Sequence, residues 1–273
     1  MLSADVLAGF GAGLDELPVA LRSVRTRQLD LCRRLADDDW GRQSRCHLWT
    51  VHDVVRHVRD GCRLHVEWLR TGVSSLHREG PFDARKTPLR WLERTASQAP
   101  DETVAELADL CAQEATALDA RLARGGDERT DAPYGPAHWT ILTAHVFWDA
   151  WIHHRDVTQP LGVDHTSSPV EDGMMALYAL LIASIPAARL NHPLDVTVEL
   201  TAGDGHAYQA SVRPAQVVVD PEDGFYQATL RGELVAVVDS LAGRGPEPDA
   251  VLHGDPAACE VLSWMRSRLL PES

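Results

Sequence analysis

The sequence has few cysteines, and none of them belongs to a Cys-x-x-Cys pair. The five that occur are odd in number and far apart along the chain: Cys32, Cys46, Cys62, Cys111 and Cys259. A disulfide framework or a cysteine-rich zinc site uses closely or regularly spaced cysteines, so this distribution argues against both. We therefore expect reduced, buried thiols.

The chain also lacks a hydrophobic run long enough to cross a membrane. The longest apolar segment, residues 174 to 188, contains Pro186 and is shorter than the about 20 residues that a membrane-spanning helix needs. The first residues carry no basic group ahead of their apolar stretch and place Asp5 inside it, which is not the pattern of a secretory signal. We expect a soluble, cytoplasmic protein.

Positive charge is scarce as well. The chain has 26 lysine and arginine residues against 40 aspartate and glutamate residues, a net charge of −14 at pH 7 with histidine neutral. Such an acidic protein repels the phosphate backbone of nucleic acids unless folding gathers its basic residues into one patch. We predict a small-molecule substrate as partner, with no nucleic acid and no membrane. The sequence does not decide between a monomer and a dimer.

Helical periodicity is the main pattern that the chain does have. Hydrophobic residues make up 44% and charged residues 24% of the 273 positions, as in a globular protein with one large or two ordinary domains. A helix is predicted from Thr50 to Gly72, because Thr50 and Asp53 have the spacing of a capping box. Its buried stripe is predicted to hold Val51, Val54, Val58, Cys62, His65 and Leu69. Further helices are expected around residues 21–35, 104–122, 138–158 and 170–188.

The pattern changes after Pro193. Residues 195–201 and 207–213 alternate apolar and polar positions around a glycine-containing turn, which predicts a β-hairpin. Further strands are predicted in VVVD, YQATLRG and AVLHGD, with a helix at residues 232–245 and a final helix capped by Asp255. The predicted fold class is therefore α+β, with a helical bundle over residues 1–190 and a small α+β domain over residues 191–273.

The segment WDAWIHHRDV, residues 148 to 157, places polar residues inside an otherwise buried helix. Residues four apart on a helix differ by only about 40° in direction, so Asp149 and His153 project side by side. His145 and Asp156 flank them, whereas His154 points well away from this group. An ion pair on a solvated helix face is one explanation for such a pattern.

A second helix supplies the other explanation. His57 lies at the edge of the buried stripe of the helix predicted from residue 50 to 72. If the two helices pack together, two imidazoles and a carboxylate converge on one point. Two histidines and one carboxylate form an open site for a divalent metal, and zinc suits these ligands. The spacing alone leaves open whether these residues form a metal site or ordinary structural pairs.

Three segments of the chain resemble one known family. CHLWTVHDVVRHV, residues 46 to 58, resembles a signature in which a Cys-x-x-Trp-Thr-Val segment opens a helix that ends in a ligand histidine. WDAWIHHRDVTQPLG, residues 148 to 162, resembles its second signature, and LRGELVAVVDSLAGRG with LHGDPAACEVL is similar to the C-terminal domain of the same proteins. This family is the mycothiol-dependent maleylpyruvate isomerase group. The resemblance covers nearly the whole chain and implies a DinB-like up-down four-helix bundle that holds a divalent metal, followed by a small domain.

By this resemblance, His57, Asp149 and His153 are the metal ligands. The family more often has glutamate where Asp149 stands, so either the helices lie closer together here or Asp149 binds the metal through water. Asp156 is expected to orient a ligand histidine or an arginine from outside the ligand set, with a salt bridge at the helix C-terminus as the alternative. Arg244 matches a position from which the small domain offers a catalytic guanidinium, with a solvated arginine as the alternative.

The other aromatic and imidazole side chains near these motifs are predicted to be structural. Trp49, Trp148 and Trp151 are expected to fill the core. His145 is expected to be a packed histidine, with a place in the cavity wall as the alternative.

The resemblance implies a metal-dependent enzyme that uses mycothiol as a cosubstrate. Coordination to zinc would deprotonate a thiol whose pKa is about 8.5, and the thiolate would attack an activated double bond or an epoxide. An isomerase or an S-transferase is therefore the first hypothesis. A hydrolase or lyase that activates water at the same metal is the alternative, and a non-catalytic binding or regulatory module is a further alternative. The sequence does not identify the substrate.

Overall fold

In the computed structural model, the chain divides into a helical unit, Leu17–Thr166, and an α+β unit that joins Met1–Glu16 to Ser167–Ser273. The fold class is α+β, as the sequence predicts. The residues that the structure describes are 7–10, 16–73, 75–76, 78, 80, 82–83, 86–126, 128–132, 135–189, 196–201, 207–213, 216–220, 228–231, 234–241, 244, 251–254 and 256.

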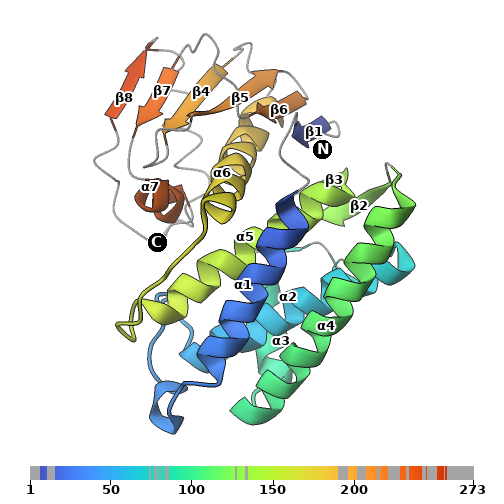
Figure 1. The fold of residues 1–273 in the computed structure, drawn as a ribbon, viewed down its shortest axis with the longest axis vertical. Coiled ribbons are helices and arrows are strands. Elements are labelled where there is room, and N and C mark those ends of the chain that lie inside the picture. The colour runs from blue at the N-terminus through green and yellow to red at the C-terminus, as the bar shows by residue number, and fades with distance from the viewer. Residues whose placement is uncertain are drawn as a thin grey trace. The chain divides into compact units, whose positions relative to one another are not determined.

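Four long helices form the helical unit (Figure 1). α2 and α1 each pack against both α4 and α5, which closes the four into the bundle that the sequence predicts. The shorter helix α3 packs beside α2. The bounds are α1 (Leu17–Cys32), α2 (Val51–Thr71), α3 (Lys86–Arg94), α4 (Pro100–Arg124) and α5 (Trp139–Thr158), with a 3-10 turn at Asp37–Asp39 and a hairpin of β2 (Arg129–Ala132) and β3 (Gly135–His138) between α4 and α5.

Local signals determine where α2 begins and ends. The Thr50 hydroxyl accepts from the Asp53 backbone N–H at 3.2 Å, and the Asp53 carboxylate accepts from the Thr50 N–H at 2.8 Å. Gly72 ends the helix at a φ of 71°, a left-handed conformation that glycine adopts without strain. Every residue of the predicted stripe is at most 3% exposed: Val51, Val54, Val58, Cys62, His65 and Leu69. The predicted helix and its buried face are confirmed.

A buried polar network links all four long helices. Arg25 of α1 donates to both carboxylate oxygens of Glu114 of α4, at 2.9 and 3.2 Å. His65 of α2 lies 2.8 Å from Glu114 through Nδ1 and 3.1 Å from the Thr143 hydroxyl of α5 through Nε2. Burial opposes the ionisation of Glu114, but Arg25 and His65 outweigh it and hold its pKa at about 2. The network therefore depends on a charged Glu114, and loss of one partner would leave an uncompensated buried charge.

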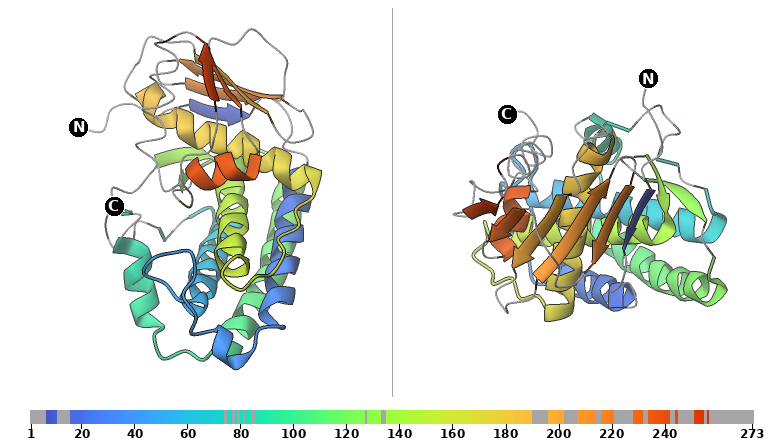
Figure 2. Two further views of the ribbon diagram at one scale, coloured as in Figure 1. Left: turned by 90° about the vertical axis from the view of Figure 1, so that its left-hand side faces the viewer. Right: turned by 90° about the horizontal axis from the view of Figure 1, so that it is seen from above.

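A six-stranded sheet forms the α+β unit, in the strand order β1-β6-β5-β4-β7-β8. β4 and β5 form the predicted antiparallel hairpin, whereas β1 pairs in parallel with β6 and β7 pairs in parallel with β4. α6 packs across one face of the sheet against β5 and β6, and α7 packs against α6 (Figure 2). The bounds are β1 (Leu7–Phe10), α6 (Pro169–Arg189), β4 (Val196–Thr201), β5 (Ala207–Arg213), β6 (Gln216–Asp220), β7 (Ala228–Arg231), α7 (Leu234–Leu241) and β8 (Val251–Gly254).

This division differs from the predicted domains 1–190 and 191–273 at both ends. α6 belongs with the sheet and not with the bundle, and β1 brings the N-terminal segment into the same sheet. Met175, Leu177, Tyr178 and Leu181 of α6 are at most 2% exposed. A helix that is apolar over so much of its surface needs a broad apolar partner, and a sheet face provides one. The predicted domain boundary was placed where the sequence changes from a helical to an alternating pattern. The two units instead separate between Thr166 and Ser167, before α6.

Several elements were not predicted, namely α3, β1 and the β2–β3 hairpin. The helix predicted after Asp255 lies outside the described residues. None of the described helices is long and apolar enough to cross a membrane. The described cysteines are free thiols, and all are buried except Cys111, which is half-buried: Cys32, Cys46, Cys62 and Cys111.

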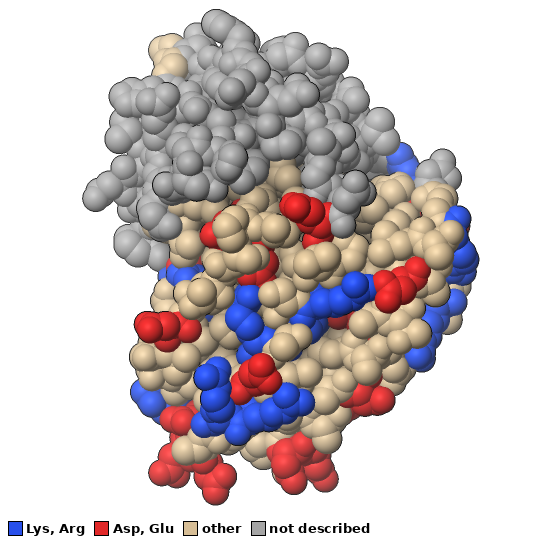
Figure 3. All heavy atoms as spheres, in the orientation of Figure 1, with Lys and Arg blue, Asp and Glu red and all other residues tan. Residues whose placement is uncertain are grey.

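Charged side chains are mixed on the helical unit. On the face drawn in Figure 3, lysine and arginine side chains lie interspersed with aspartate and glutamate side chains. Arg33 and Asp30 form one of the exposed ion pairs, at 2.9 Å. Exposed pairs of this kind contribute little to stability, so the bundle depends on its core and its buried network.

Candidate metal centre

α2 and α5 bring His57, Asp149 and His153 together. His57 Nε2 lies 3.3 Å from Asp149 Oδ1, and His153 Nε2 lies 3.4 Å from the same oxygen. The two imidazole rings have centroids 4.7 Å apart. The side chains are only 13%, 20% and 7% exposed for His57, Asp149 and His153, so the group is shielded but open on one side.

The separations between these atoms match those of ligands around zinc. Zinc bonds to nitrogen and oxygen are about 2.0–2.1 Å long, so two ligand atoms at the tetrahedral angle stand about 3.3–3.4 Å apart. The separations of 3.3 and 3.4 Å from Asp149 Oδ1 fall in this range. One donor atom from each of the three residues lies within 4.8 Å of the other two. The residues therefore fit a divalent metal with three protein ligands and one position left for a small molecule.

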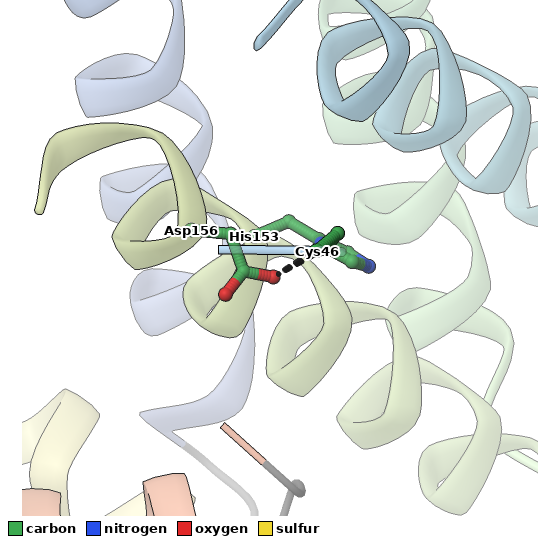
Figure 4. A group of neighbouring side chains, drawn as sticks. All are labelled: Cys46, His153 and Asp156. Atoms are coloured by element: carbon green, nitrogen blue, oxygen red, sulfur yellow. Dashed lines mark hydrogen bonds and ion pairs between the residues drawn. The ribbon is translucent and has the colours of Figure 1, made fainter. Parts of the chain in front are cut away.

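A second group of possible ligands, Cys46, His153 and Asp156, has shorter separations (Figure 4). Asp156 Oδ2 lies 3.0 Å from Cys46 Sγ and 2.9 Å from His153 Nδ1. A zinc ion between a sulfur and an oxygen would hold the two atoms about 3.5 Å apart. These shorter separations are those of hydrogen bonds, so the distances fit the first group better as metal ligands and the second group as hydrogen-bonded support for His153.

Asp156 occupies the position of a partner to a metal-binding histidine. His153 Nδ1 donates to Asp156 Oδ2, which leaves Nε2 facing Asp149 and His57. Histidines that bind metals usually donate their other ring N–H to a carboxylate or a carbonyl in this way, which fixes the tautomer and the ring orientation. Asp156 is completely buried, and its backbone carbonyl accepts from the Arg45 N–H at 3.0 Å.

Electrostatic interactions within the group keep Asp149 ionised and favour a proton on His153. Burial opposes the ionisation of Asp149, but His57 and His153 outweigh it and hold the pKa of Asp149 well below its usual range. Burial also opposes the charged form of His153, but Asp149 and Asp156 outweigh it and raise the pKa of His153 well above its usual range. Asp149 is therefore a carboxylate, and a metal at His153 Nε2 must displace a proton.

Gly61 of α2 lies opposite Asp149. A β-carbon at Gly61 would stand 3.6 Å from Asp149 Oδ2, an ordinary contact distance, so the two helices approach closely at this level. The short aspartate thereby reaches both imidazoles without an intervening water. Direct binding of a metal by Asp149 stays a prediction.

A cavity of about 90 Å³ lies beside His57 and Asp149. His65, His145 and Gly61 also line it, and the other lining residues are apolar: Leu64, Leu76, Phe82, Trp91, Leu142 and Val146. His145 was expected to be a packed histidine, whereas it lines this cavity. Desolvation lowers the pKa of His145 to about 4, so its ring is neutral near pH 7. The mixture of apolar and polar groups resembles that of small-molecule sites, but the volume is below the about 300–1,000 Å³ of sites that enclose a drug-sized ligand.

The other candidates lie in different surroundings. Trp49 packs against the hydrophobic core, as expected, but it is half-buried, and its ring centroid lies 4.8 Å from that of His57 and 5.7 Å from that of His153. His154 Nδ1 lies 3.0 Å from His165 Nδ1, and His154 belongs to neither group of possible ligands. Arg244 is part of the α+β unit, where its backbone N–H donates to the Asp239 carbonyl at 2.7 Å; its catalytic role stays a prediction.

Comparison with known proteins adds to this geometry. The family described as the mycothiol maleylpyruvate isomerase N-terminal domain matches residues 21–158, which is half of the chain. Crystal structures of the mycothiol-dependent maleylpyruvate isomerase and of a mutant with one histidine replaced by alanine are similar, with TM-scores of 0.60 and 0.59. Each is 14% identical and aligns over 88% of this chain and 92% of its own, so the likeness shows the fold. None of the curated proteins matches the chain.

Proposed function

Because the chain belongs to the mycothiol maleylpyruvate isomerase N-terminal domain family, we propose that it is an enzyme that uses the thiol mycothiol and a divalent metal, with zinc the expected ion. Its substrate is proposed to be a small electrophile. The observation that carries this proposal is the convergence of His57, Asp149 and His153 beside an apolar cavity, at separations that suit zinc. The neighbouring structures are mycothiol-dependent isomerases by name, which agrees with a thiol as cosubstrate.

Each residue of the centre has a task in this proposal. His57, Asp149 and His153 hold the ion, and Asp156 keeps a proton on His153 Nδ1 so that Nε2 offers its lone pair. The bound ion supplies a lowered thiol pKa, so that a thiolate is available at neutral pH. The apolar wall of the cavity keeps bulk water away from the sulfur and the substrate.

The proposed reaction is cis–trans isomerisation by addition and elimination. The thiolate sulfur forms a bond to one carbon of an activated double bond, the remaining single bond rotates, and the same carbon–sulfur bond then breaks. The thiol is regenerated, so no oxidant or reductant is needed and no cysteine of the chain reacts. Addition without elimination would give an S-conjugate, which is the transferase form of the same chemistry. Arg244 is proposed to bind a substrate carboxylate through its two-pronged guanidinium.

Thiol dependence of turnover tests this proposal. Maleylpyruvate is the first substrate to try, with and without mycothiol, on metal-loaded wild type, His57→Ala and the matched control His154→Ala. We expect turnover to require the thiol. It should be abolished in His57→Ala and retained in His154→Ala. Metal-loaded protein that converts a substrate without any thiol would favour a hydrolase or lyase instead. Protein that binds neither metal nor mycothiol would favour a non-catalytic module.

Calorimetry gives an independent measurement. Thiol binding should release a proton, because the coordinated form is the thiolate. The measured heat should therefore change with the ionisation enthalpy of the buffer when mycothiol is added to metal-loaded protein. Asp149→Ala should show little mycothiol binding, because it lacks one ligand of the centre.

A further inference from the structure

Cys46 lies against the centre without belonging to the proposed ligands. Its thiol donates to Asp156 Oδ2 at 3.0 Å, and its sulfur lies 3.8 Å from His153 Nδ1 (Figure 4). Cys46 is 8% exposed, and Asp156 is completely buried. The proposed chemistry uses no protein thiol, so this contact has a different role.

A tight loop holds Cys46 in this position. The side-chain amide of Gln43 donates to the carbonyl oxygens of Cys46 and Trp49, at 2.7 and 2.8 Å. The Ser44 hydroxyl accepts from the Cys46 N–H at 3.0 Å, and the Trp49 N–H donates to the Cys46 carbonyl at 2.9 Å. The backbone of Cys46 is thus bonded on both sides within its own loop, and the thiol is presented at a defined place before any metal binds.

The same loop contacts His153 at two places. The sulfur of Cys46 lies 3.8 Å from Nδ1 of the His153 imidazole. The Trp49 ring packs near the imidazoles of both His153 and His57. The proposed metal position lies at Nε2, on the opposite edge of the His153 ring from Cys46. The sulfur of Cys46 therefore cannot reach an ion bound by Nε2, which separates its role from that of a ligand.

Asp156 is the group through which Cys46 acts. One oxygen, Oδ2, accepts from both the His153 Nδ1–H and the Cys46 thiol, while Oδ1 lies 3.9 Å from Arg45 Nε. A buried carboxylate must be satisfied by several donors, and the Cys46 thiol and the His153 Nδ1–H converge on the same oxygen of Asp156. A thiol is a weak donor, but a charged acceptor strengthens the bond.

We propose that Cys46 is a positioning residue of the metal centre. Its thiol fixes the Asp156 carboxylate, which holds the Nδ1–H of His153 and aims Nε2 at the metal. A metal-binding histidine commonly donates to a carboxylate, and here the hydrogen-bonded chain continues from that carboxylate to Cys46. This inference rests on the proposed metal centre and adds to it a residue that neither ligates the ion nor reacts.

Two substitutions separate hydrogen bonding from packing. Cys46→Ala removes the donor, and Cys46→Ser keeps one of similar size. Partners outside the ligand set typically change metal affinity by about 10–100-fold, so we expect about a 10-fold loss for Cys46→Ala and about a 3-fold loss or less for Cys46→Ser. Cys62→Ala is the matched control, because Cys62 is a fully buried cysteine of the same bundle and belongs to neither group of possible ligands. We expect it to cost stability and to leave metal affinity unchanged.

Zinc affinity is measured by competition with a chelator, and the ligand set by the absorption of the cobalt-substituted protein. Wild type without added thiol should lack a thiolate-to-cobalt charge-transfer band. A band that disappears in Cys46→Ser would make Cys46 a ligand and overturn the proposal. Unchanged affinity in Cys46→Ala, or equal losses in Cys46→Ala and Cys46→Ser, would overturn it as well.

A metal-free measurement distinguishes failure of this inference from failure of the proposed function. The His153 Nδ1–H proton should give a resolved, slowly exchanging NMR signal in metal-free wild type and in Cys46→Ser. The signal should broaden or disappear in Cys46→Ala. If wild type binds no metal but the signal behaves as expected, the proposed function fails, whereas the part of the inference in which Cys46 orients His153 through Asp156 is supported. A signal that is unchanged in Cys46→Ala would overturn the role whatever the metal result.

Discussion

Metal affinity is predicted to decrease as the pH decreases, because His153 holds a proton that the metal must displace. Asp149 and Asp156 raise the pKa of His153 in the metal-free protein, in spite of its burial. The metal needs the lone pair of Nε2, so at a pH below this raised pKa a proton must leave before the ion binds. Each unit of pH then changes the affinity by about tenfold, or about 1.4 kcal/mol. Asp149 adds no proton, because its pKa is lowered.

Asp156→Asn tests the assignment, because it retains the shape of the side chain and removes its charge. Asp156 Oδ2 lies 2.9 Å from His153 Nδ1, and its hydrogen bond is one of the interactions that raise the pKa of His153. The steep part of the curve of affinity against pH should therefore begin at a lower pH in the variant. At high pH the variant should bind metal about 10–100-fold more weakly, because its histidine is a poorer ligand. The two curves should approach each other as the pH falls.

The assay is zinc competition against a chelator of known proton affinity, at a series of pH values and constant ionic strength. Protons bound elsewhere in the centre are common to both proteins and cancel in the comparison. Curves that stay parallel over the whole range would refute the reasoning, because the proton that the metal displaces would then not be the one that Asp156 stabilises.

Three further predictions concern residues of the bundle. Glu114→Ala should lower the free energy of unfolding by about 3–5 kcal/mol in urea titrations, because it leaves Arg25 buried without its partner, whereas the exposed Glu93→Ala should have little effect. In wild type the stabilisation from Glu114, about 3 kcal/mol, should be complete above pH 4.5 and lost as the pH falls to about 2, since its native pKa is about 2 and its ordinary value is 4.5. Gly61→Leu should weaken zinc binding in the chelator assay by filling the space beside Asp149 Oδ2, and Gly61→Ala should not, because its β-carbon fits at 3.6 Å.

The parts of the fold that were predicted from the sequence are determined by residues that lie close together along the chain. The capping box of Thr50 and Asp53 and the buried stripe of α2 are local patterns, and the structure has both. The proximity of Asp149 and His153 follows from their spacing on one helix. The proximity of His57 required the resemblance to the family, because nothing in the spacing says which two helices pack together.

The parts that were not predicted depend on contacts between distant segments. β1 pairs with β6, and α6 packs on β5 and β6; neither pairing leaves a periodic signal in the sequence. The roles of Trp49 and Cys46 depend on how one loop folds back on α5, which residue type alone does not reveal. Both residues stand in the segment CHLWTVHDVVRHV that carries the resemblance, and that was the one signal available for them.

Elemental analysis of protein purified without a histidine tag decides whether His57, Asp149 and His153 form a metal centre. Wild type, His57→Ala and His154→Ala are equilibrated with buffered zinc, freed of loosely bound ions, and compared as zinc per chain. We predict one ion per chain for wild type and for His154→Ala, and none for His57→Ala. A His57→Ala protein that carries as much zinc as wild type would contradict the assignment of the centre.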